Sequence, residues 1–301
     1  MQTIQLISLR HSAFYTPYLM TFMGGFLVEQ GLKAEYQCVS NVEELERLLS
    51  TGKAHVAQSA VGISMRKRSL EPNTKNDIYH FAQINQRDGF FIAASLESSA
   101  VNFNWNHLEN KRIIADHLFQ PIATLKFVLN RKGVDIGKIE FIDIGDAQQS
   151  QLAFLSGEAD FIHLQGPYPQ QLVAEGKAKI VASVGAALGE IAYSSLCATS
   201  TWLESSMAKK FMVAYKKALN YVQKTEAQYL AKQISPQFNS INLETLTSTI
   251  DAYKKLESWT TQACISKSAF ESANKVFLFS GDISSNIDYG CVVSDELCNA
   301  D

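Results

Sequence analysis

Apolar and polar residues along the chain alternate with a period of two in some segments, typical of strands, and near 3.6 in others, typical of helices. Residues 1–9 alternate as a strand. Residues 17–30 then carry a helical apolar pattern that ends at Gly31, and residues 32–39 alternate as a strand again. Because glycine directly after a helical pattern is a common helix stop, this stretch predicts strand, helix and strand in order.

The second half of the chain repeats this pattern. Residues 121–132 have helical spacing, Gly133 ends them, and residues 139–142 form the next strand pattern. The order and the position of the glycine are the same as in the first half.

A further unit of helix and glycine stop also occurs twice. Residues 42–50 and 148–156 form helical patterns, and Gly52 and Gly157 follow them. A strand pattern comes after each glycine. An internal repeat that keeps its order and register over two units predicts two homologous α/β lobes.

Strands that alternate with helices over short connections imply mostly parallel sheets with helices packed on their faces. Ligands of such sheets bind beyond the carboxyl ends of the strands, so we expect a ligand cleft between the two lobes. Residues 79–94 have the pattern of a crossing to the second lobe, and residues 192–199 that of the return. The expected first lobe therefore comprises residues 1–88 and 194–301, and the second lobe residues 89–193.

The remaining chain is expected to complete the first lobe. Long amphipathic patterns cover residues 207–233 and 243–259, with a helix stop at Ser235-Pro236-Gln237 between them. Residues 279–301 are rich in Gly, Ser, Asn and Asp and predict an irregular extension.

Composition limits the classes of partner. Of 301 residues, 46% are hydrophobic and 19% are charged, and the formal net charge is -3 at pH 7. No apolar run reaches the ~20 residues that a membrane helix needs. Lysine and arginine are scattered, so no basic stripe favours nucleic acid as a partner.

The first residues have neither the basic start nor the apolar stretch of a secretory signal. Two locations stay open. The protein is expected to be periplasmic or membrane-associated if a leader has been removed, and cytoplasmic otherwise.

Five cysteines are widely spaced along the chain. They are Cys38, Cys197, Cys264, Cys291 and Cys298. None forms the C-x-x-C pair of a zinc or thioredoxin-like site, and common catalytic and calcium-binding motifs do not occur, so we expect no metal and no cofactor. A bridge between Cys291 and Cys298 is possible in an oxidising compartment, and ordinary buried cysteines are the alternative.

Candidate ligand-binding residues are polar and aromatic side chains that follow the expected strands or lie at the crossings, near helix starts. In the first lobe they are His11, Ser12, Tyr15, Gln58, Ser59, Asn85 and Asp88. In the second lobe they are Asp116, His117, Phe119, Gln120, His163, Gln165, Tyr168, Glu190 and Tyr193. Helix capping and core packing are the alternative roles for such residues.

The residue types in this set suggest a kind of ligand. Aromatic side chains from both lobes favour a flat heterocycle held between ring faces, and Glu190 or Asp116 would accept hydrogen bonds from its ring N–H or amino groups. The acidic Asp116 favours a cationic or amine-bearing ligand over a sulfonate or phosphate.

Five short segments occur in an order shared with a known family. They are residues 11–18, 25–32, 49–57, 155–162 and 166–168. Together they resemble the transporter substrate-binding proteins for sulfonates, taurine and thiamine-pyrimidine precursors, over about residues 1–260. The resemblance implies a two-lobed, type II periplasmic-binding-protein-like α/β fold. It also implies that the lobes close on a small organic ligand and deliver it to the membrane permease of an ABC transporter.

The same superfamily includes an enzyme branch, the thiamine-pyrimidine synthases, which use a lysine, a histidine and a cysteine-rich loop. By this resemblance the lysine falls near Ser59 and the histidine near Ile63, where neither group is present. Cys197 has no cysteine beside it. The resemblance therefore implies a binding protein rather than an enzyme.

Two alternative functions remain. One is a synthase-like enzyme in which Lys53 or Lys67 replaces the missing lysine and His11 acts as the base. The other is a cytoplasmic small-molecule sensor that lacks a DNA-binding partner.

Overall fold

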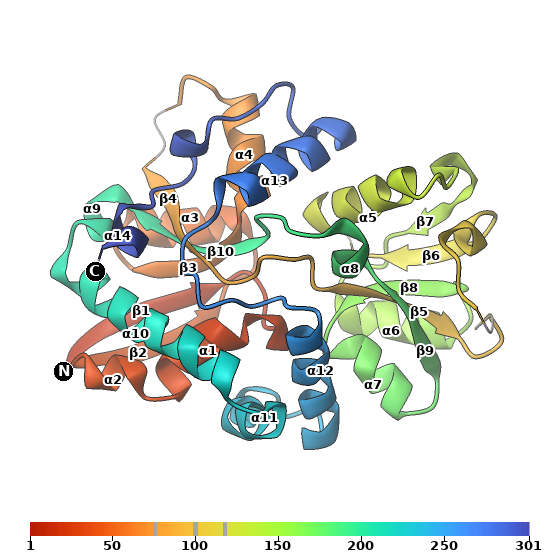
Figure 1. The fold of residues 1–301 in the computed structure, drawn as a ribbon, viewed down its shortest axis with the longest axis horizontal. Coiled ribbons are helices and arrows are strands. Elements are labelled where there is room, and N and C mark those ends of the chain that lie inside the picture. The colour runs from red at the N-terminus through yellow and green to blue at the C-terminus, as the bar shows by residue number, and fades with distance from the viewer. Residues whose placement is uncertain (75–76, 99–101, 117–118, 301) are drawn as a thin grey trace.

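The computed structural model describes residues 1–74, 77–98, 102–116 and 119–300, and it shows two sheets in two lobes that lie side by side (Figure 1). The first sheet has the strand order β2-β1-β3-β10-β4 and the second β7-β6-β8-β5-β9. The strands are β1 (Gln2–Ser8), β2 (Leu32–Cys38), β3 (Val56–Ala60), β4 (Ile78–Gln83), β5 (Phe90–Ser95), β6 (Arg112–Ala115), β7 (Glu140–Ile142), β8 (Phe161–Gln165), β9 (Ala178–Ser183) and β10 (Ser194–Thr199).

The two sheets have the same topology. In each, three adjacent strands at one side of the sheet pair in parallel, as β1 does with β2 and β3 and β6 does with β7 and β8. One strand of each sheet, β10 or β5, runs antiparallel to both neighbours. It is the strand that enters from the other lobe, so it starts where the parallel strands end. The two-lobed type II α/β fold expected from the sequence is confirmed, with this one reversed strand in each sheet.

Helices cover the faces of both sheets. The α-helices are α1 (Thr16–Met23), α2 (Phe26–Glu29), α3 (Val42–Ser50), α4 (Val61–Leu70), α5 (Phe119–Arg131), α6 (Ala147–Leu155), α7 (Tyr168–Ala174), α8 (Val184–Leu188), α9 (Ser200–Leu203), α10 (Ser206–Lys224), α11 (Ala227–Ile234), α12 (Leu243–Lys255), α13 (Lys267–Ser280) and α14 (Glu296–Asn299). Short 3-10 turns are η1 (Ala13–Tyr15), η2 (Trp105–Leu108), η3 (Ile136–Lys138), η4 (Ser235–Gln237) and η5 (Tyr289–Cys291).

Local chemistry explains why both halves fold alike. The side chain of Asn41 accepts a hydrogen bond from the Glu44 amide at 2.8 Å and caps α3, and Asp146 caps the equivalent α6 through the Gln149 amide at 2.8 Å. Such caps satisfy amides that the first helical turn leaves without a partner. The helix stops Gly31 and Gly133 have φ angles of 73° and 74°, which glycine adopts without steric cost.

Two expected helices are each divided in the structure. The pattern over residues 17–30 forms α1 and α2, because Gly25 between them has a φ of 80° and interrupts the helix. The pattern over residues 207–233 forms α10 and α11, because Thr225 takes an extended conformation after α10.

The segment expected to be an irregular extension, residues 279–301, contains the short η5 and α14, and helix α13 extends into its first residues. Helix α13 lies beside α4 of the first lobe and α5 of the second (Figure 1). Its Phe277 packs on Phe119 with 5.6 Å between ring centres. Beyond α13 the chain runs along the edge strand β4, where the His80 amide donates to the Val292 carbonyl and the Ser294 amide to the His80 carbonyl.

A disulfide joins Cys264 to Cys298, with 5.4 Å between their Cα atoms. This corrects the possible bridge from Cys298 to Cys291, whose thiol is free and exposed. Cys298 instead faces the segment before α13, so the bridge holds the C-terminal end against the first lobe.

Within the described ranges, no helix has both the length and the apolar character that crossing a membrane requires. Lobe boundaries at residues 88/89 and 193/194 stay a prediction.

The crossing between β4 and β5 packs closely on α8. Gly185 has no Cβ, and a Cβ built there would lie 2.1 Å from the Asp88 carbonyl oxygen. Such a distance forces the backbone apart, so only glycine fits at this position.

We expect Gly185→Ala to lower the free energy of unfolding by about 1–3 kcal/mol, because the added methyl group must displace the Asp88 backbone. Urea unfolding monitored by circular dichroism measures the change. Gly290→Ala is the matched control, since nothing lies within 4 Å of a Cβ at that position. Equal stability of the two variants would contradict the expected crowding.

Candidate functional site

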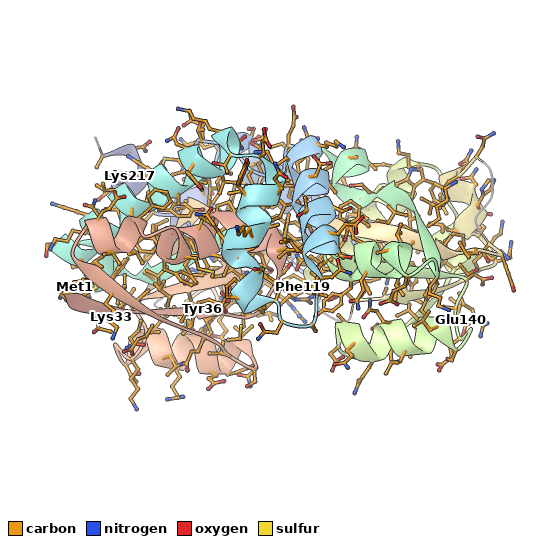
Figure 2. All side chains as sticks on the ribbon, turned by 90° about the horizontal axis from the view of Figure 1, so that it is seen from below. Met1, Lys33, Tyr36, Phe119, Glu140 and Lys217 are labelled. Carbon is orange, nitrogen blue, oxygen red and sulfur yellow. A yellow bond between two sulfur atoms is a disulfide. The ribbon has the colours of Figure 1, made fainter. Side chains whose placement is uncertain are left out.

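A cleft of about 1060 Å³ lies between the lobes. It is lined by the ends of β1, β3, β6 and β8 and by residues of α4, α5 and α7. Figure 2 shows Phe119 near the junction of the lobes, with Lys33 and Glu140 toward opposite ends of the molecule. The volume is close to the upper end of the roughly 300–1,000 Å³ that small-molecule sites occupy.

Ten residues that the sequence predicts as ligand contacts line this cleft. They are His11, Ser12, Tyr15, Gln58, Asp116, Phe119, Gln120, Gln165, Tyr168 and Tyr193. These residues were predicted because they follow a strand end and lie near a helix start. Most of the residues predicted in this way line the cleft.

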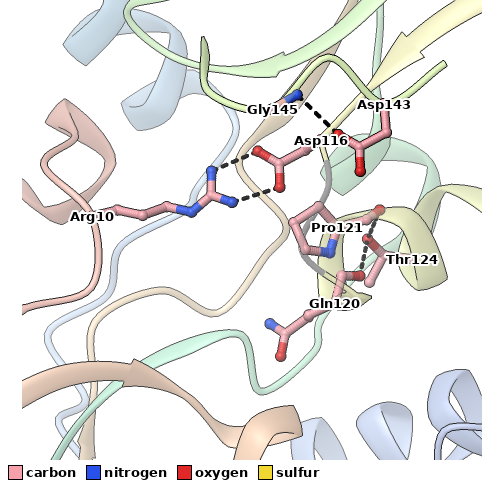
Figure 3. Close-up of polar contacts among 7 residues, drawn as sticks. All are labelled: Arg10, Asp116, Gln120, Pro121, Thr124, Asp143 and Gly145. Atoms are coloured by element: carbon pink, nitrogen blue, oxygen red, sulfur yellow. Dashed lines mark hydrogen bonds and ion pairs between the residues drawn. The ribbon is translucent and has the colours of Figure 1, made fainter. Parts of the chain in front are cut away.

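An ion pair between Arg10 and Asp116 connects the lobes inside the cleft (Figure 3). Arg10 follows β1 and Asp116 follows β6, which are equivalent strands of the two repeats. Nη1 of Arg10 donates to Oδ2 at 2.6 Å and Nη2 to Oδ1 at 2.5 Å, so the contact is bidentate. We call it the interlobe ion pair.

The surroundings of this pair hold it in its charged form. The Arg10 side chain is 22% exposed and that of Asp116 is 6% exposed. Burial opposes the charge on Arg10, but the Asp116 carboxylate outweighs it, and the pKa of Arg10 is raised above its usual value. The guanidinium carbon also lies 5.8 Å from the centre of the Phe90 ring, within cation-π range. Sequence reasoning missed Arg10, although it adjoins His11 at the same strand end.

On the first-lobe side, His11 and Ser12 are held by protein partners. His11 Nε2 lies 2.6 Å from the Gln237 carbonyl oxygen, and its ring stacks on Phe238 at 4.4 Å between centres. Burial lowers the pKa of His11, with the Gln237 hydrogen bond opposing. Ser12 caps η1 through the Phe14 amide and donates to the Gly166 carbonyl of the second lobe at 2.8 Å.

Amide groups supply further hydrogen-bonding capacity. Gln120 Oε1 accepts from the Gly62 amide at 3.2 Å, which is another contact between lobes. Among described residues, Gln120 Nε2 and Gln58 Oε1 are buried and have no hydrogen-bond partner. A donor and an acceptor at the cleft wall can therefore both serve a ligand.

Charged side chains of α3 and α4 also line the cleft, and the sequence did not indicate them. Lys67 pairs with Glu46 at 2.5 Å, and Arg66 lies 5.3 Å from the Phe119 ring centre. Glu43 and Glu71 lie on the same side. These positions follow no strand end, which is why the strand-end rule does not find them.

Five residues predicted as ligand contacts do not line this cleft. They are Ser59, Asn85, Asp88, His163 and Glu190. Ser59 points to the opposite face of β3 from Gln58, because successive strand residues alternate faces. Glu190 is exposed and accepts from Ser266 Oγ at 2.8 Å. His117 lies outside the described residues.

Asn85 and His163 are two of the buried residues among these five. Asn85 Nδ2 donates to the Phe14 carbonyl at 2.8 Å. His163 lies deeper in β8 than Gln165 and packs on Phe90 with 4.7 Å between ring centres. Burial lowers the pKa of His163 to about 4, so its ring is neutral at pH 7.

Asp88 is a buried carboxyl at the crossing. It accepts from Thr124 Oγ1 at 2.5 Å and from the Phe90 amide at 2.7 Å. Burial raises the pKa of Asp88 to about 7, although both hydrogen bonds oppose the rise. Asp88 therefore joins the crossing to α5.

No group of three or more His, Cys, Asp or Glu side chains in the described part of the chain is arranged to hold a metal ion.

The fold and the interlobe cleft define the class: a two-lobed protein of the type II periplasmic-binding fold. A family model described as "NMT1/THI5 like" matches residues 13–228, which is more than half of the chain. The chain belongs to this NMT1/THI5-like family.

The chain is similar in sequence to one curated protein and in structure to several solved proteins. The Bacillus subtilis (strain 168) protein named "Putative binding protein YtlA" is 25% identical over 298 residues, 98% of this chain and 88% of that protein. A ligand-binding component of an ABC-type import system from Staphylococcus aureus, with zinc bound, has a TM-score of 0.77 at 14% identity, covering 99% and 98% of the two chains. The alkanesulfonate-binding protein SsuA from Xanthomonas axonopodis pv. citri, bound to MOPS, has a TM-score of 0.74 at 12% identity, covering 98% and 99%.

The raised pKa of Asp88 predicts a pH-dependent stability. Below its unfolded pKa near 3.8 both states are protonated, and up to about pH 7 only the folded state keeps the proton. The proton bound to Asp88 thus stabilises the folded state fully at low pH, and this stabilisation is lost as the pH rises through about 7. Melting temperatures of the wild type and Asp88→Asn between pH 4 and 8 test this. We expect the wild type to lose stability relative to the variant as the pH rises, and parallel profiles would contradict it.

Proposed function

We propose that this protein is a solute-binding protein that captures a small organic ligand between its lobes and delivers it to the membrane permease of an ABC transporter. The observation that supports this most directly is the cleft, whose lining comes from both lobes. A ligand held there contacts both lobes at once. It therefore favours the closed arrangement by the difference in its affinity for the two states.

The crossings are the natural hinge of such a closure. We propose lobe boundaries at 88/89 and 193/194, at the two segments that join the sheets. Few residues need to change φ and ψ there, while each sheet with its helices moves as a unit. Asp88 and Gly185 pack together beside one crossing, which limits the paths that the chain can take.

The lining favours a flat heterocycle, such as a thiamine-pyrimidine precursor. Rings of Phe90, Phe119 and Tyr168 line the cleft, and the buried amide atoms of Gln58 and Gln120 can bond to ring nitrogens or amino groups. A sulfonate is the second candidate, supported by the likeness to the alkanesulfonate-binding protein.

Delivery to a permease places the protein outside the cytoplasm, in the periplasm or at the membrane surface. The Cys264–Cys298 disulfide supports this location, since such bonds persist in oxidising compartments. The fold shared with the ABC-type import component supports the partner. A cytoplasmic sensor is the alternative, and it would work in a reducing compartment.

A thermal-shift screen tests ligand capture, because a ligand that binds only the folded state raises the melting temperature. Thiamine-pyrimidine precursors, sulfonates, polyamines and amino acids are the compounds to compare, with titration calorimetry of each hit. We expect one class to bind saturably, and Tyr168→Ala to weaken it about 5- to 10-fold through lost ring contact. Tyr229→Ala, on exposed α11, is the matched control and should bind as the wild type does. Binding by none of the four classes, or equal loss in both variants, would contradict the proposal.

We infer that the cleft binds rather than catalyses. In the synthase-like alternative, the replacement lysine is Lys53 or Lys67. Lys53 is exposed and does not line the cleft, Lys67 is paired with Glu46, and His11 is hydrogen-bonded to a main-chain carbonyl. Neither lysine is therefore placed to form a Schiff base in the cleft, and the His11 ring is already engaged by a protein group.

Incubation with pyridoxal phosphate separates binding from this chemistry. We expect no Schiff-base absorbance above that of a surface-lysine control protein. A stoichiometric band that Lys67→Met or Lys53→Met abolishes would favour the enzyme. The measurement is an absorbance titration, with borohydride reduction and mass mapping of any modified lysine.

A further inference from the structure

We propose that Asp116 determines the specificity of the cleft by occupying the anion-binding face of Arg10, so that the protein rejects small anions. This inference rests on the proposed function and decides between its two ligand candidates. Asp116 acts as a built-in counterpart for the guanidinium, in the position where a ligand's carboxylate or sulfonate would otherwise bind.

The geometry of the interlobe ion pair carries the argument. A guanidinium group binds a planar anion through two parallel N–H donors, and Asp116 takes both, at 2.6 and 2.5 Å (Figure 3). An anion that used the same donors would have to displace a carboxylate that is 6% exposed. Asp116 would then lose its guanidinium partner while buried beside a second negative charge, which costs free energy on both counts.

Other cations of the lining do not offer a replacement in this part of the cleft. Lys67 is paired with Glu46, and Arg66 lies on Phe119 and within 3.9 Å of an Asp282 oxygen. His163, beneath Phe90, has its pKa lowered to about 4 by burial and carries no charge at pH 7.

The charges of the cleft lining also disfavour an anionic ligand. Carboxylates outnumber cations among the described residues that line the cleft. The acids are Glu43, Glu46, Glu71, Asp116 and Asp146, and the cations are Arg10, Arg66 and Lys67. A ligand entering this field is favoured if it is neutral or cationic, and disfavoured if it is an anion.

Replacing Asp116 by an isosteric amide should therefore expose the guanidinium to solutes. In Asp116→Asn, Arg10 stays charged and partly buried but loses its carboxylate, so small anions become its counter-ions. We expect methanesulfonate, nitrate and acetate to bind the variant at least tenfold more tightly than the wild type, and to raise its melting temperature saturably at constant ionic strength.

Two further variants identify the cause. Arg10→Gln/Asp116→Asn should lose the gained anion binding, because the guanidinium is gone. Glu43→Gln removes one negative charge from the same lining without releasing Lys67 from Glu46, and it leaves the interlobe ion pair intact. It should change anion affinity less than twofold, whereas a gain equal to that of Asp116→Asn would mean that net charge alone is responsible and would overturn the inference.

Wild-type binding keeps the inference testable even if Asp116→Asn does not fold. Calorimetry of the wild type with methanesulfonate should give no saturable heat. Saturable binding that Arg10→Gln abolishes would overturn the role of Asp116 while leaving solute capture supported. An anion site that appears only in Asp116→Asn supports the inference about Asp116. If the wild type also binds none of the screened solutes, that second result contradicts the proposed function but not the role of Asp116.

Discussion

The identical strand order of the two sheets is the constraint on which the cleft depends. Because β1 and β6 hold equivalent places and their carboxyl ends face each other across the lobes, the residues that follow them meet. Arg10 and Asp116 are those residues, and opposite charges that follow equivalent strands give one bidentate contact. The repeat thus creates both the space between the lobes and the strongest polar link across it.

Two further hydrogen bonds across the cleft join neutral groups. Ser12 bonds to the Gly166 carbonyl, and Gln120 to the Gly62 amide. On the first-lobe side of the crossing, Tyr253 of α12 accepts from the Gly166 amide and donates to the Gly89 carbonyl. Neutral hydrogen bonds exchange with water at small net cost, whereas a buried ion pair is costly to break. The contact between Arg10 and Asp116 is therefore the costliest of these polar contacts to break.

Much of the fold and part of the site follow from local sequence patterns. Glycine stops at Gly31 and Gly133 and alternating strands are local signals, so the repeat, the two lobes and most strand-end residues could be predicted. The partner of Arg10 could not, because pairing over more than a hundred residues has no local signature. The sequence also does not show which way the side chain of Glu190 points. A residue at a crossing can face either the cleft or solvent, and the sequence does not distinguish them.

The C-terminal segment beside β4 changes how the first lobe meets its surroundings. β4 is an outermost strand, and a bare outermost strand presents unpaired main-chain groups that another chain can join. The Val292 carbonyl accepts a hydrogen bond from the His80 amide, and the Ser294 amide donates one to the His80 carbonyl. The disulfide holds this segment in place. One covalent bond between Cys264 and Cys298 thus anchors the segment that covers the main-chain groups of His80 on this outermost strand.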